Sequence, residues 1–552
     1  MKALSLLVAL LAVPAWGQPA VDLRLEARAA LSFDAQGRLI EHRHGEGVAI
    51  AIHKGHITWI GPTHTGPEGK SLIREPEAIV VPGLVDAHGH LTGLGQALER
   101  LDLRSASSPS AVAAQVKRAA AEAAEGQWIT GRGWDQNLWP GGAFPTHEIL
   151  SAAVPDRPVV LTRVDGHAIW VNARVLQHAG INGQTPDPQG GQILRDASGQ
   201  PTGVLIDSAV DLVRQKMPEP SEADITRWVL RAVAACRAVG LTGVHDAGAT
   251  AAQVKVYRQL AQQGQLGFRV HVLLDDQDPH IAPLVEAGPQ RGDMVQVMGV
   301  KLFADGALGS RGASLLSDYT DAHGHKGTPI ITGDVLIEKV NRYAAKGFQI
   351  GVHGIGDAAV REIVDAYAGL PKDQRHRMRV EHAQIVHPDD QRRMGEMGII
   401  ASVQPVHATS DMGWAEKRLG PERIRHAYAW RSLVNAGAPL ALGSDFPVES
   451  PDPLAGLYAA VTRQKPSGPK GGWYAAEALT PAEALRGFTL DAAFASFTED
   501  RRGRIAVGQV ADLTLLSADP RERAQLETLK TLGVLVAGKR YLGGESKLPS
   551  KR

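Results

Sequence analysis

The segment Val81-Pro-Gly-Leu-Val-Asp-Ala-His-Gly-His90 ends an apolar run with two histidines spaced i, i+2. Successive side chains of a β-strand point to opposite faces, so His88 and His90 share one face near the C-terminal end of the predicted strand. Two convergent imidazoles suit half of a metal site. The simplest alternative is a chance His-x-His pair, because the chain has 21 histidines in 552 residues.

Three later segments end in the same way. A short β-prone apolar run precedes each of His353, His382 and Asp445. Core packing favours apolar residues at strand ends, whereas nitrogen and carboxylate ligands suit a divalent ion such as Zn²⁺, Mn²⁺, Co²⁺ or Fe²⁺. The sequence therefore predicts that these side chains bind metal at a set of strand ends. For Asp445 alone, a helix N-cap is the structural alternative.

Strand-like runs alternate with helical patterns after residue 80, which is typical of βα units. The expected strands are 80–88, 241–246, 268–275, 297–304, 348–353, 378–382, 399–404 and 439–445. Helices are expected at 221–239, 334–346, 357–370 and 389–397, the last three with an Asp as N-cap. Eight such units predict an α/β fold, a (β/α)8 TIM-like barrel with its active site at the C-terminal strand ends. An open doubly wound sheet is the alternative, but no glycine-rich phosphate turn follows the first strand.

Both ends of the chain carry strand-like pieces that are too short to bury a core separately. We expect residues 18–81 and 500–545 to form one small β-sandwich domain beside a catalytic barrel at 82–499. The connection at about 100–235 is too long for an ordinary βα loop, so it is expected to be an inserted subdomain.

Several polar and aromatic residues are weaker candidates for substrate contacts. Trp134, Asp165 and His167 lie in the insertion, where such groups suit a cap over the barrel mouth. A packed insertion with paired polar residues is the alternative. Asp305 and Arg311 follow the fourth strand and either orient substrate or brace loops.

Taken together, the segments that hold these residues resemble the amidohydrolase superfamily. The matching stretches are Pro82–His90, Val300–Gly306, Gly351–His353, Val380–Ala383 and Gly443–Asp445. Lys301–Asp305, Leu308–Arg311 and Ser444–Pro447 further resemble amidohydrolase family 3, the YtcJ-like branch that includes N-substituted formamide deformylases. The resemblance covers nearly all of the chain after residue 20 and implies a metal barrel paired with a small β-sandwich.

The resemblance also implies roles for single residues. The expected metal ligands are His88, His90, Lys301, His353, His382 and Asp445. In binuclear members a lysine on strand four is carboxylated and bridges two ions, and Lys301 matches its position in an apolar strand where an ammonium is costly to bury. If one ion is bound instead, His382 polarises the substrate. Glu381 precedes His382 on its strand and is expected to point away from the site.

The expected chemistry is hydrolysis. A divalent ion, Zn²⁺ by preference and present as one or two ions, lowers the pKa of its bound water to about 7. Asp445 is assigned as ligand and general base, which passes the proton of water to the leaving nitrogen. The predicted function is hydrolysis of a non-peptide carbon–nitrogen bond in an N-formyl or N-acyl amine. A lactone or ester hydrolase and a non-catalytic binding or regulatory protein are the alternatives, since fold and metal do not identify the leaving group.

The composition limits the kinds of binding partner to be expected. The 59 basic and 59 acidic residues cancel, which argues against a surface built for nucleic acid or anionic lipid. A small-molecule substrate is the expected partner, and the oligomeric state stays open, with a homodimer among the alternatives. Cys236 is the single cysteine, so an intrachain disulfide is excluded.

The first residues predict export. Lys2, the apolar run at 3–13 and Ala15-Trp16-Gly17 are typical of a signal peptide at 1–17 that is cleaved after Gly17. The apolar run is too short to span a bilayer, and no later segment is typical of a membrane span. We therefore expect a periplasmic or secreted protein.

Overall fold

A computed structural model describes residues 21–123, 126–164, 167–375 and 377–542, which form two compact units. One unit comprises residues 21–91 and 233–542, and the other comprises residues 92–232. The predicted signal peptide at 1–17 lies outside the described residues. None of the described helices is long and apolar enough to cross a bilayer.

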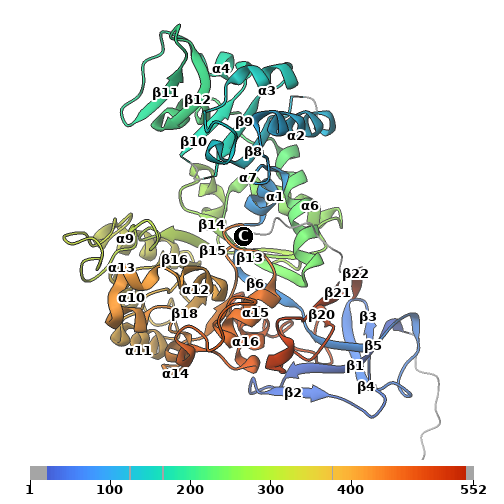
Figure 1. The fold of residues 1–552 in the computed structure, drawn as a ribbon. Helices are drawn as coiled ribbons and strands as arrows, with labels where there is room; N and C mark the ends of the chain where they lie inside the picture. The colour runs from blue at the N-terminus through green and yellow to red at the C-terminus, as the bar shows by residue number, and fades with distance from the viewer. Residues whose placement is uncertain (1–20, 124–125, 165–166, 376, 543–552) are drawn as a thin grey trace, which may run out of the picture. The chain divides into compact units, whose positions relative to one another are not determined.

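The first unit contains a barrel of eight parallel strands (Figure 1). In chain order they are β6 (Leu84–Gly89), β13 (Leu241–Ala249), β14 (Arg269–Asp275), β15 (Val295–Phe303), β16 (Gln349–Gly354), β17 (Arg379–His382), β18 (Ile400–Val403) and β19 (Leu440–Leu442). Each strand pairs with the next in parallel register. All eight predicted strands are present, and the predicted (β/α)8 barrel is confirmed.

Backbone hydrogen bonds close the barrel between its first strand and the segment after its last strand. The Asp445 N–H donates to the His88 carbonyl oxygen at 2.7 Å, and the His90 N–H donates to the Phe446 carbonyl oxygen at 2.8 Å. Three of the four backbone groups in these two bonds belong to predicted metal ligands, and the fourth belongs to Phe446. We call this pair of hydrogen bonds the barrel seam. The closure fixes the ends of β6 and β19 against each other.

Helices follow the barrel strands. They are α7 (Ala251–Gln262), α8 (Ala282–Glu286), α9 (Gly333–Ala345), α10 (Asp357–Gly369), α11 (Pro388–Met397), α12 (Pro405–Asp411), α13 (Ala415–Arg423), α14 (Trp430–Asn435), α15 (Pro453–Thr462), α16 (Pro481–Gly487) and α17 (Leu490–Ala495), while α6 (Glu222–Ala238) leads into β13. The predicted aspartate N-caps of α9, α10 and α11 are wrong. The N-cap of α11 is His387, because Pro388 takes the first helical position and moves Asp389 into the first turn. Asp334 and Asp357 also lie in first turns, where a carboxylate still complements the helix dipole.

Both ends of the chain build a second sheet in the first unit. Its order is β22 (Lys539–Leu542), β21 (Thr531–Val536), β20 (Leu513–Leu516), β5 (Gly69–Pro82), β1 (Val21–Phe33), β3 (Val48–His53) and β4 (His56–Pro62), with β2 (Leu39–His42) paired to β1. Leu25 and Ile50 from the N-terminal part share a core with Leu513 and Leu535 from the C-terminal part. Because β5 leads directly into β6, this sheet anchors the first barrel strand.

The second unit has its own sheet and core. The sheet order is β11 (Gly191–Arg195), β12 (Pro201–Asp207), β10 (Ala168–Val171), β9 (Val159–Arg163), β8 (Ile129–Trp134) and β7 (Leu101–Asp102), accompanied by α2 (Pro109–Glu122), α3 (His147–Ala153) and α4 (Ala173–Ala179). Trp134, Trp139 and Trp170 pack with ring centroids 6.0–6.2 Å apart.

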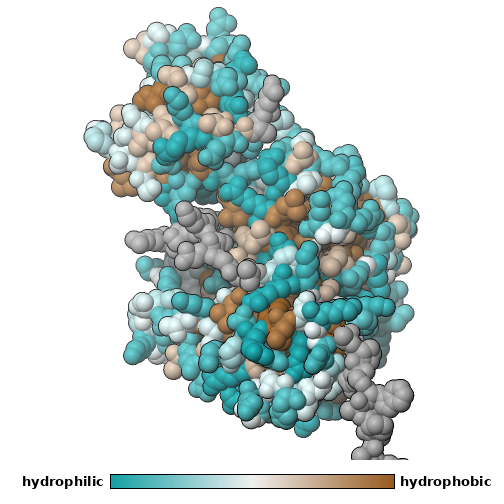
Figure 2. Space-filling model, turned by 90° about the vertical axis from the view of Figure 1, so that its right-hand side faces the viewer, coloured by the Kyte–Doolittle hydropathy of each residue, from teal (hydrophilic) through white to brown (hydrophobic). Residues whose placement is uncertain are grey.

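On the face shown in Figure 2 the surface is mostly hydrophilic, with apolar residues in separate patches.

Candidate metal centre

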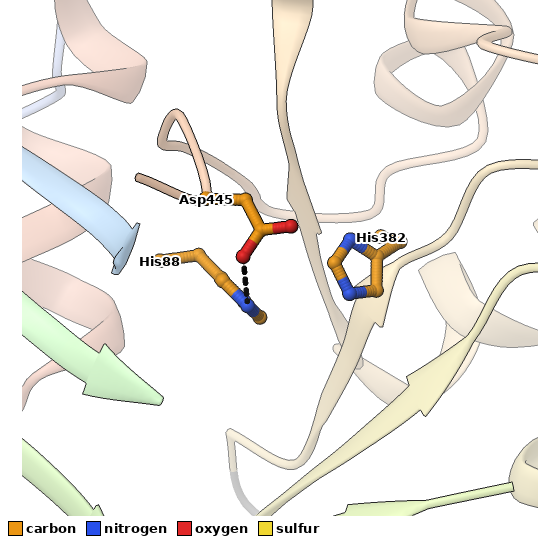
Figure 3. A group of neighbouring side chains, drawn as sticks. All are labelled: His88, His382 and Asp445. Carbon is orange, nitrogen blue, oxygen red and sulfur yellow. Dashed lines mark ion pairs between the residues drawn. The ribbon is translucent and has the colours of Figure 1, made fainter. Parts of the chain in front are cut away.

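Three side chains from three strand ends meet inside the barrel. His88 on β6, His382 at the end of β17 and Asp445 after β19 each offer a ligand atom within 4.8 Å of the others, and all three residues are buried. The Asp445 carboxylate lies between the two imidazoles in Figure 3, with Oδ1 at 3.5 Å from His88 Nε2. The His88 and His382 ring centroids are 4.8 Å apart. This group brings together residues that are almost 360 positions apart in the chain.

Two further histidines border this group. His90 Nε2 lies 3.0 Å from Asp445 Oδ1, so both histidines of the His-x-His pair contact one carboxylate oxygen. His353, on β16, has its ring centroid 4.4 Å from that of His382. The sequence placed both residues at the C-terminal strand ends, and the structure brings them to the same end of the barrel.

Lys301 lies on β15 and is 1% exposed. Within the described part of the chain, no carboxylate lies at ion-pair distance from its ammonium group. Burial lowers the pKa of Lys301 to about 8, and the charges of Glu381 and Asp445 oppose that shift. A buried lysine with this pKa is partly neutral near neutral pH, which is the form that adds carbon dioxide.

The site is held by a second layer of hydrogen bonds. His88 Nδ1 lies 2.6 Å from Glu381 Oε2, and Glu381 Oε1 accepts a hydrogen bond of 2.7 Å from Nε of the fully buried Arg379. His382 Nδ1 lies 2.8 Å from Gln404 Oε1. Each contact engages Nδ1 and leaves Nε2 for a metal, as second-layer partners of metal-bound histidines do.

The prediction for Glu381 is wrong in one respect. Glu381 does not contribute to the ligand group, but its side chain points to His88 instead of away from the site. Strict alternation stops at this strand end, because His382 has a φ of 72° and Ala383 a φ of 39°. The left-handed backbone lets consecutive side chains, Glu381 and His382, both reach the interior.

Electrostatics favour the protonation states that bind metal. Burial lowers the pKa of His88 to about 4 and that of His353 to about 3, so both are neutral at pH 7. Burial alone would raise the pKa of Asp445, but the hydrogen bond from His90 holds that pKa below its usual value. Neutral imidazoles and an ionised carboxylate are the forms that coordinate metals.

The residues present fit a divalent ion. The Nε2 atoms of His88 and His353 are buried and have no hydrogen-bond partner in the described part of the chain. His88 Nε2 lies 3.5 Å from Asp445 Oδ1, and His353 Nε2 lies 3.6 Å from Asp305 Oδ1. A buried polar atom is normally satisfied, so these two nitrogens indicate a missing electrophilic partner. Nitrogen and oxygen donors of this kind suit Zn²⁺ and other borderline divalent ions.

Comparison with known proteins identifies the family. A model of the amidohydrolase family matches residues 77–541. The chain belongs to the amidohydrolase family.

Relatives of this amidohydrolase match along most of their length. This chain is 35% identical over 469 residues to the Bacillus subtilis (strain 168) protein YtcJ, which is named as an amidohydrolase. The match covers 84% of this chain and 88% of YtcJ. The chain is 28% identical over 546 residues to the N-substituted formamide deformylase of Arthrobacter pascens, with 93% of this chain and 98% of that protein covered. The crystal structure of an uncharacterized metal-dependent hydrolase from Pyrococcus furiosus superposes with a TM-score of 0.75 at 26% identity, covering 90% of this chain and 100% of the other. The amidohydrolase is therefore a hydrolase of a metal-dependent family.

Asp305 and Arg311 brace loops in the amidohydrolase. The Asp305 carboxylate accepts backbone hydrogen bonds from Ser314, Ile355 and Gly356 at 2.8, 3.0 and 2.8 Å. Arg311 forms two hydrogen bonds with Asp321, at 3.1 and 3.0 Å. Of the two roles that the sequence left open, the contacts support loop bracing for both residues.

The candidates in the insertion lie in the second unit of the amidohydrolase. Trp134 is fully buried and its Nε1 donates to the Leu161 carbonyl oxygen at 2.8 Å, so its assignment to substrate is corrected to a core role. His167 is exposed and its Nδ1 lies 2.9 Å from Asp207 Oδ1. Asp165 lies outside the described residues.

One residue near the metal centre of the amidohydrolase was missed. His407 follows β18 on α12, and its Nε2 lies 3.9 Å from Asp445 Oδ2. The sequence holds a signal for it, because His407 also follows a short apolar strand. It was missed because it lies four positions after Val403, the last residue of β18, on the following helix, whereas the other histidines lie within a strand or directly after one.

Proposed function

We propose that this amidohydrolase hydrolyses a carbon–nitrogen bond other than a peptide bond, in an N-formyl or N-acyl amine. The observation that carries the proposal is the buried group of His88, His382 and Asp445 at the C-terminal end of the barrel, where enzymes of this fold have their active sites. Similarity to an N-substituted formamide deformylase along 98% of its length supports this substrate class.

The chain's own residues supply binding and proton transfer. His88, His90, His353, His382 and Asp445 would hold the ion, proposed to be Zn²⁺, with Lys301 beside them. When bound, the ion polarises a carbonyl and lowers the pKa of a water molecule to about 7. Asp445 stays ionised at neutral pH and can therefore accept a proton from the attacking water.

Asp445 then delivers this proton to the leaving nitrogen. The new carbon–oxygen bond forms, the carbon–nitrogen bond breaks, and the products are a carboxylic acid and an amine. Glu381 and Arg379 keep the His88 ring in place during these steps through the contacts already described. Proton transfer in both directions by one carboxylate requires that its surroundings stay fixed.

A panel of substrates tests the proposal. The metal-reconstituted protein is assayed with N-formyl amines, N-acyl amino acids, cyclic amides and lactones. We expect turnover of N-formyl or N-acyl amines. Turnover of lactones alone would make the protein a lactone or ester hydrolase, and binding without any turnover would favour a non-catalytic role.

A further inference from the structure

His407 lies at the same end of the barrel as the ligand group. It is the third residue of α12, which directly follows β18. Its side chain is 14% exposed, and its ring stacks almost parallel to that of His382, with centroids 6.1 Å apart and an interplanar angle of 23°. The imidazole is thus packed beside the metal centre.

The ring nitrogen that faces the centre lacks a partner. His407 Nε2 is buried and makes no hydrogen bond in the described part of the chain. Oδ2 of Asp445 lies 3.9 Å away, which is too long for a hydrogen bond but leaves a small ligand atom within reach of both groups. Buried polar atoms are usually satisfied, so this nitrogen is available to a bound molecule.

The polar neighbours of His407 are engaged elsewhere. Asp411 lies four residues later on α12, and its Oδ2 accepts a hydrogen bond of 2.7 Å from the Tyr428 hydroxyl. Gln404, at the start of α12, is paired with His382 Nδ1 at 2.8 Å. These contacts hold the surroundings of His407 without using its Nε2.

The two oxygens of Asp445 face different groups. Oδ1 lies near His88 and His90, whereas Oδ2 lies on the side of His407. Asp445 Oδ2 and the unpartnered imidazole nitrogen therefore border the same place.

We propose that His407 is a further catalytic residue, whose Nε2–H donates a hydrogen bond to the substrate carbonyl oxygen as that oxygen gains negative charge. The inference rests on the proposed function, because it requires a carbonyl substrate. His407 transfers no proton: the proton of water goes to Asp445 and then to the leaving nitrogen. A donor aimed at developing charge acts mainly in the transition state.

Two variants and three measurements test the role of His407. His407→Ala removes the donor, His407→Gln retains an N–H group, and His56→Ala changes an exposed histidine on β4 as the matched control. The measurements are kcat and KM with an N-formyl amine, the affinity for an alkylphosphonate whose tetrahedral oxygens mimic the intermediate, and the metal content per chain.

We expect His407→Ala to lower kcat by about 10²-fold or more with little change in KM, as removal of one oxyanion donor does. The affinity for the alkylphosphonate should fall by a similar factor, since such analogues bind through transition-state contacts. Metal content should stay at the wild-type value. His407→Gln should recover part of both losses, and His56→Ala should match the wild type.

Unchanged kcat and unchanged alkylphosphonate affinity in His407→Ala would overturn the inference. Loss of bound metal from both His407 variants would also overturn it, by making His407 a ligand or a support of the ligands. If the wild type turns over lactones and no N-formyl amine, the proposed function fails separately. The same comparison is then made with a lactone, whose carbonyl oxygen gains the same charge.

Discussion

At the scale of single residues, the candidate metal centre depends on a backbone conformation that residues other than glycine rarely adopt. His382 and Asp445 have φ values of 72° and 60°, in the left-handed region, although neither is glycine. Such conformations persist where surrounding contacts enforce them, and they cluster at functional sites. Here the backbone bond from Asp445 to His88 and the pairing of His382 with Gln404 supply those contacts.

Asp445 is the residue whose removal should affect chemistry most directly. Asp445→Asn keeps most of the side-chain shape but removes the proton acceptor, so kcat should fall by about two orders of magnitude or more. The measurement is steady-state hydrolysis of an N-formyl amine. The control is Asp519→Asn, at a position that follows β20 of the second sheet. Turnover near the wild-type value in Asp445→Asn would remove this residue from the mechanism.

The proposed role of Lys301 sets the expected number of metal ions. We propose that its amine adds carbon dioxide and that the resulting carbamate bridges two divalent ions, because the lysine is 1% exposed and its pKa is lowered to about 8 by burial. A metal titration should then give two ions per chain, and bicarbonate should speed reactivation after acid stripping. Lys301→Ala should abolish bicarbonate dependence.

A fully active enzyme with one ion and an unmodified Lys301 would contradict the carbamate. That result would leave a mononuclear hydrolase, in which His382 polarises the substrate.

At the scale of elements, the end of β19 packs too tightly for any side chain at Gly443. A Cβ there would lie 2.6 Å from the His88 backbone nitrogen and 2.6 Å from Asp86 Oδ1. Gly443→Ala should therefore push β19 away from β6 and displace Asp445, lowering both metal content and activity. Gly369→Ala is the control, because a Cβ there meets nothing within 4 Å.

Metal content and thermal unfolding are measured for both glycine variants. A Gly443→Ala enzyme with wild-type metal content and melting temperature would show that the contact between β19 and β6 is not rigid.

The elements were largely predictable from sequence, because the barrel imposes a repeated local pattern. Each buried strand is an apolar run, and His88, His353 and His382 stand where such runs end, so periodicity alone located them. The roles of Glu381 and Trp134 were not predictable. Positive φ values at a strand end and burial against another strand depend on tertiary contacts that periodicity does not encode.

At the scale of the whole molecule, buried histidines make stability depend on pH. The pKa values of His88, His271 and His353 are lowered to about 4, 3 and 3 by burial, below the value of about 6.5 in an unfolded chain. As pH falls below about 6.5, the unfolded state binds protons that the folded state excludes. Stability conferred by these residues is therefore complete above pH 6.5 and is lost as pH falls toward 3–4.

Buried carboxyl groups oppose this trend. Burial raises the pKa of Asp86 and Asp305 to about 7 and that of Asp491 to about 6, so their contribution decreases as pH rises from about 4 to 7. A substitution isolates the histidine contribution. In His271→Gln, the change in the free energy of unfolding between pH 7.5 and pH 5, measured in urea on the metal-free protein, should be less unfavourable than in the wild type. The same change in both proteins would contradict this contribution.

We also propose that the protein is exported, from Lys2, the apolar run at 3–13 and Ala15-Trp16-Gly17. Fractionation of native cells should place a mature chain that begins near Gln18 outside the cytoplasm. Lys2→Glu, which removes the positive charge of the n-region, should slow this processing. Recovery of a cytoplasmic chain that still begins at Met1 would refute export.

The barrel seam has a further consequence. Asp445 and His90 act as proposed ligands through their side chains while their backbone amides join the last strand to the first. Metal binding at this centre would therefore stabilise the closed barrel, because a ligand that binds only the native state shifts the folding equilibrium toward it. Removal of the metal by a chelator should lower the free energy of unfolding. The backbone hydrogen bonds that should weaken first are those between β6 and the segment after β19.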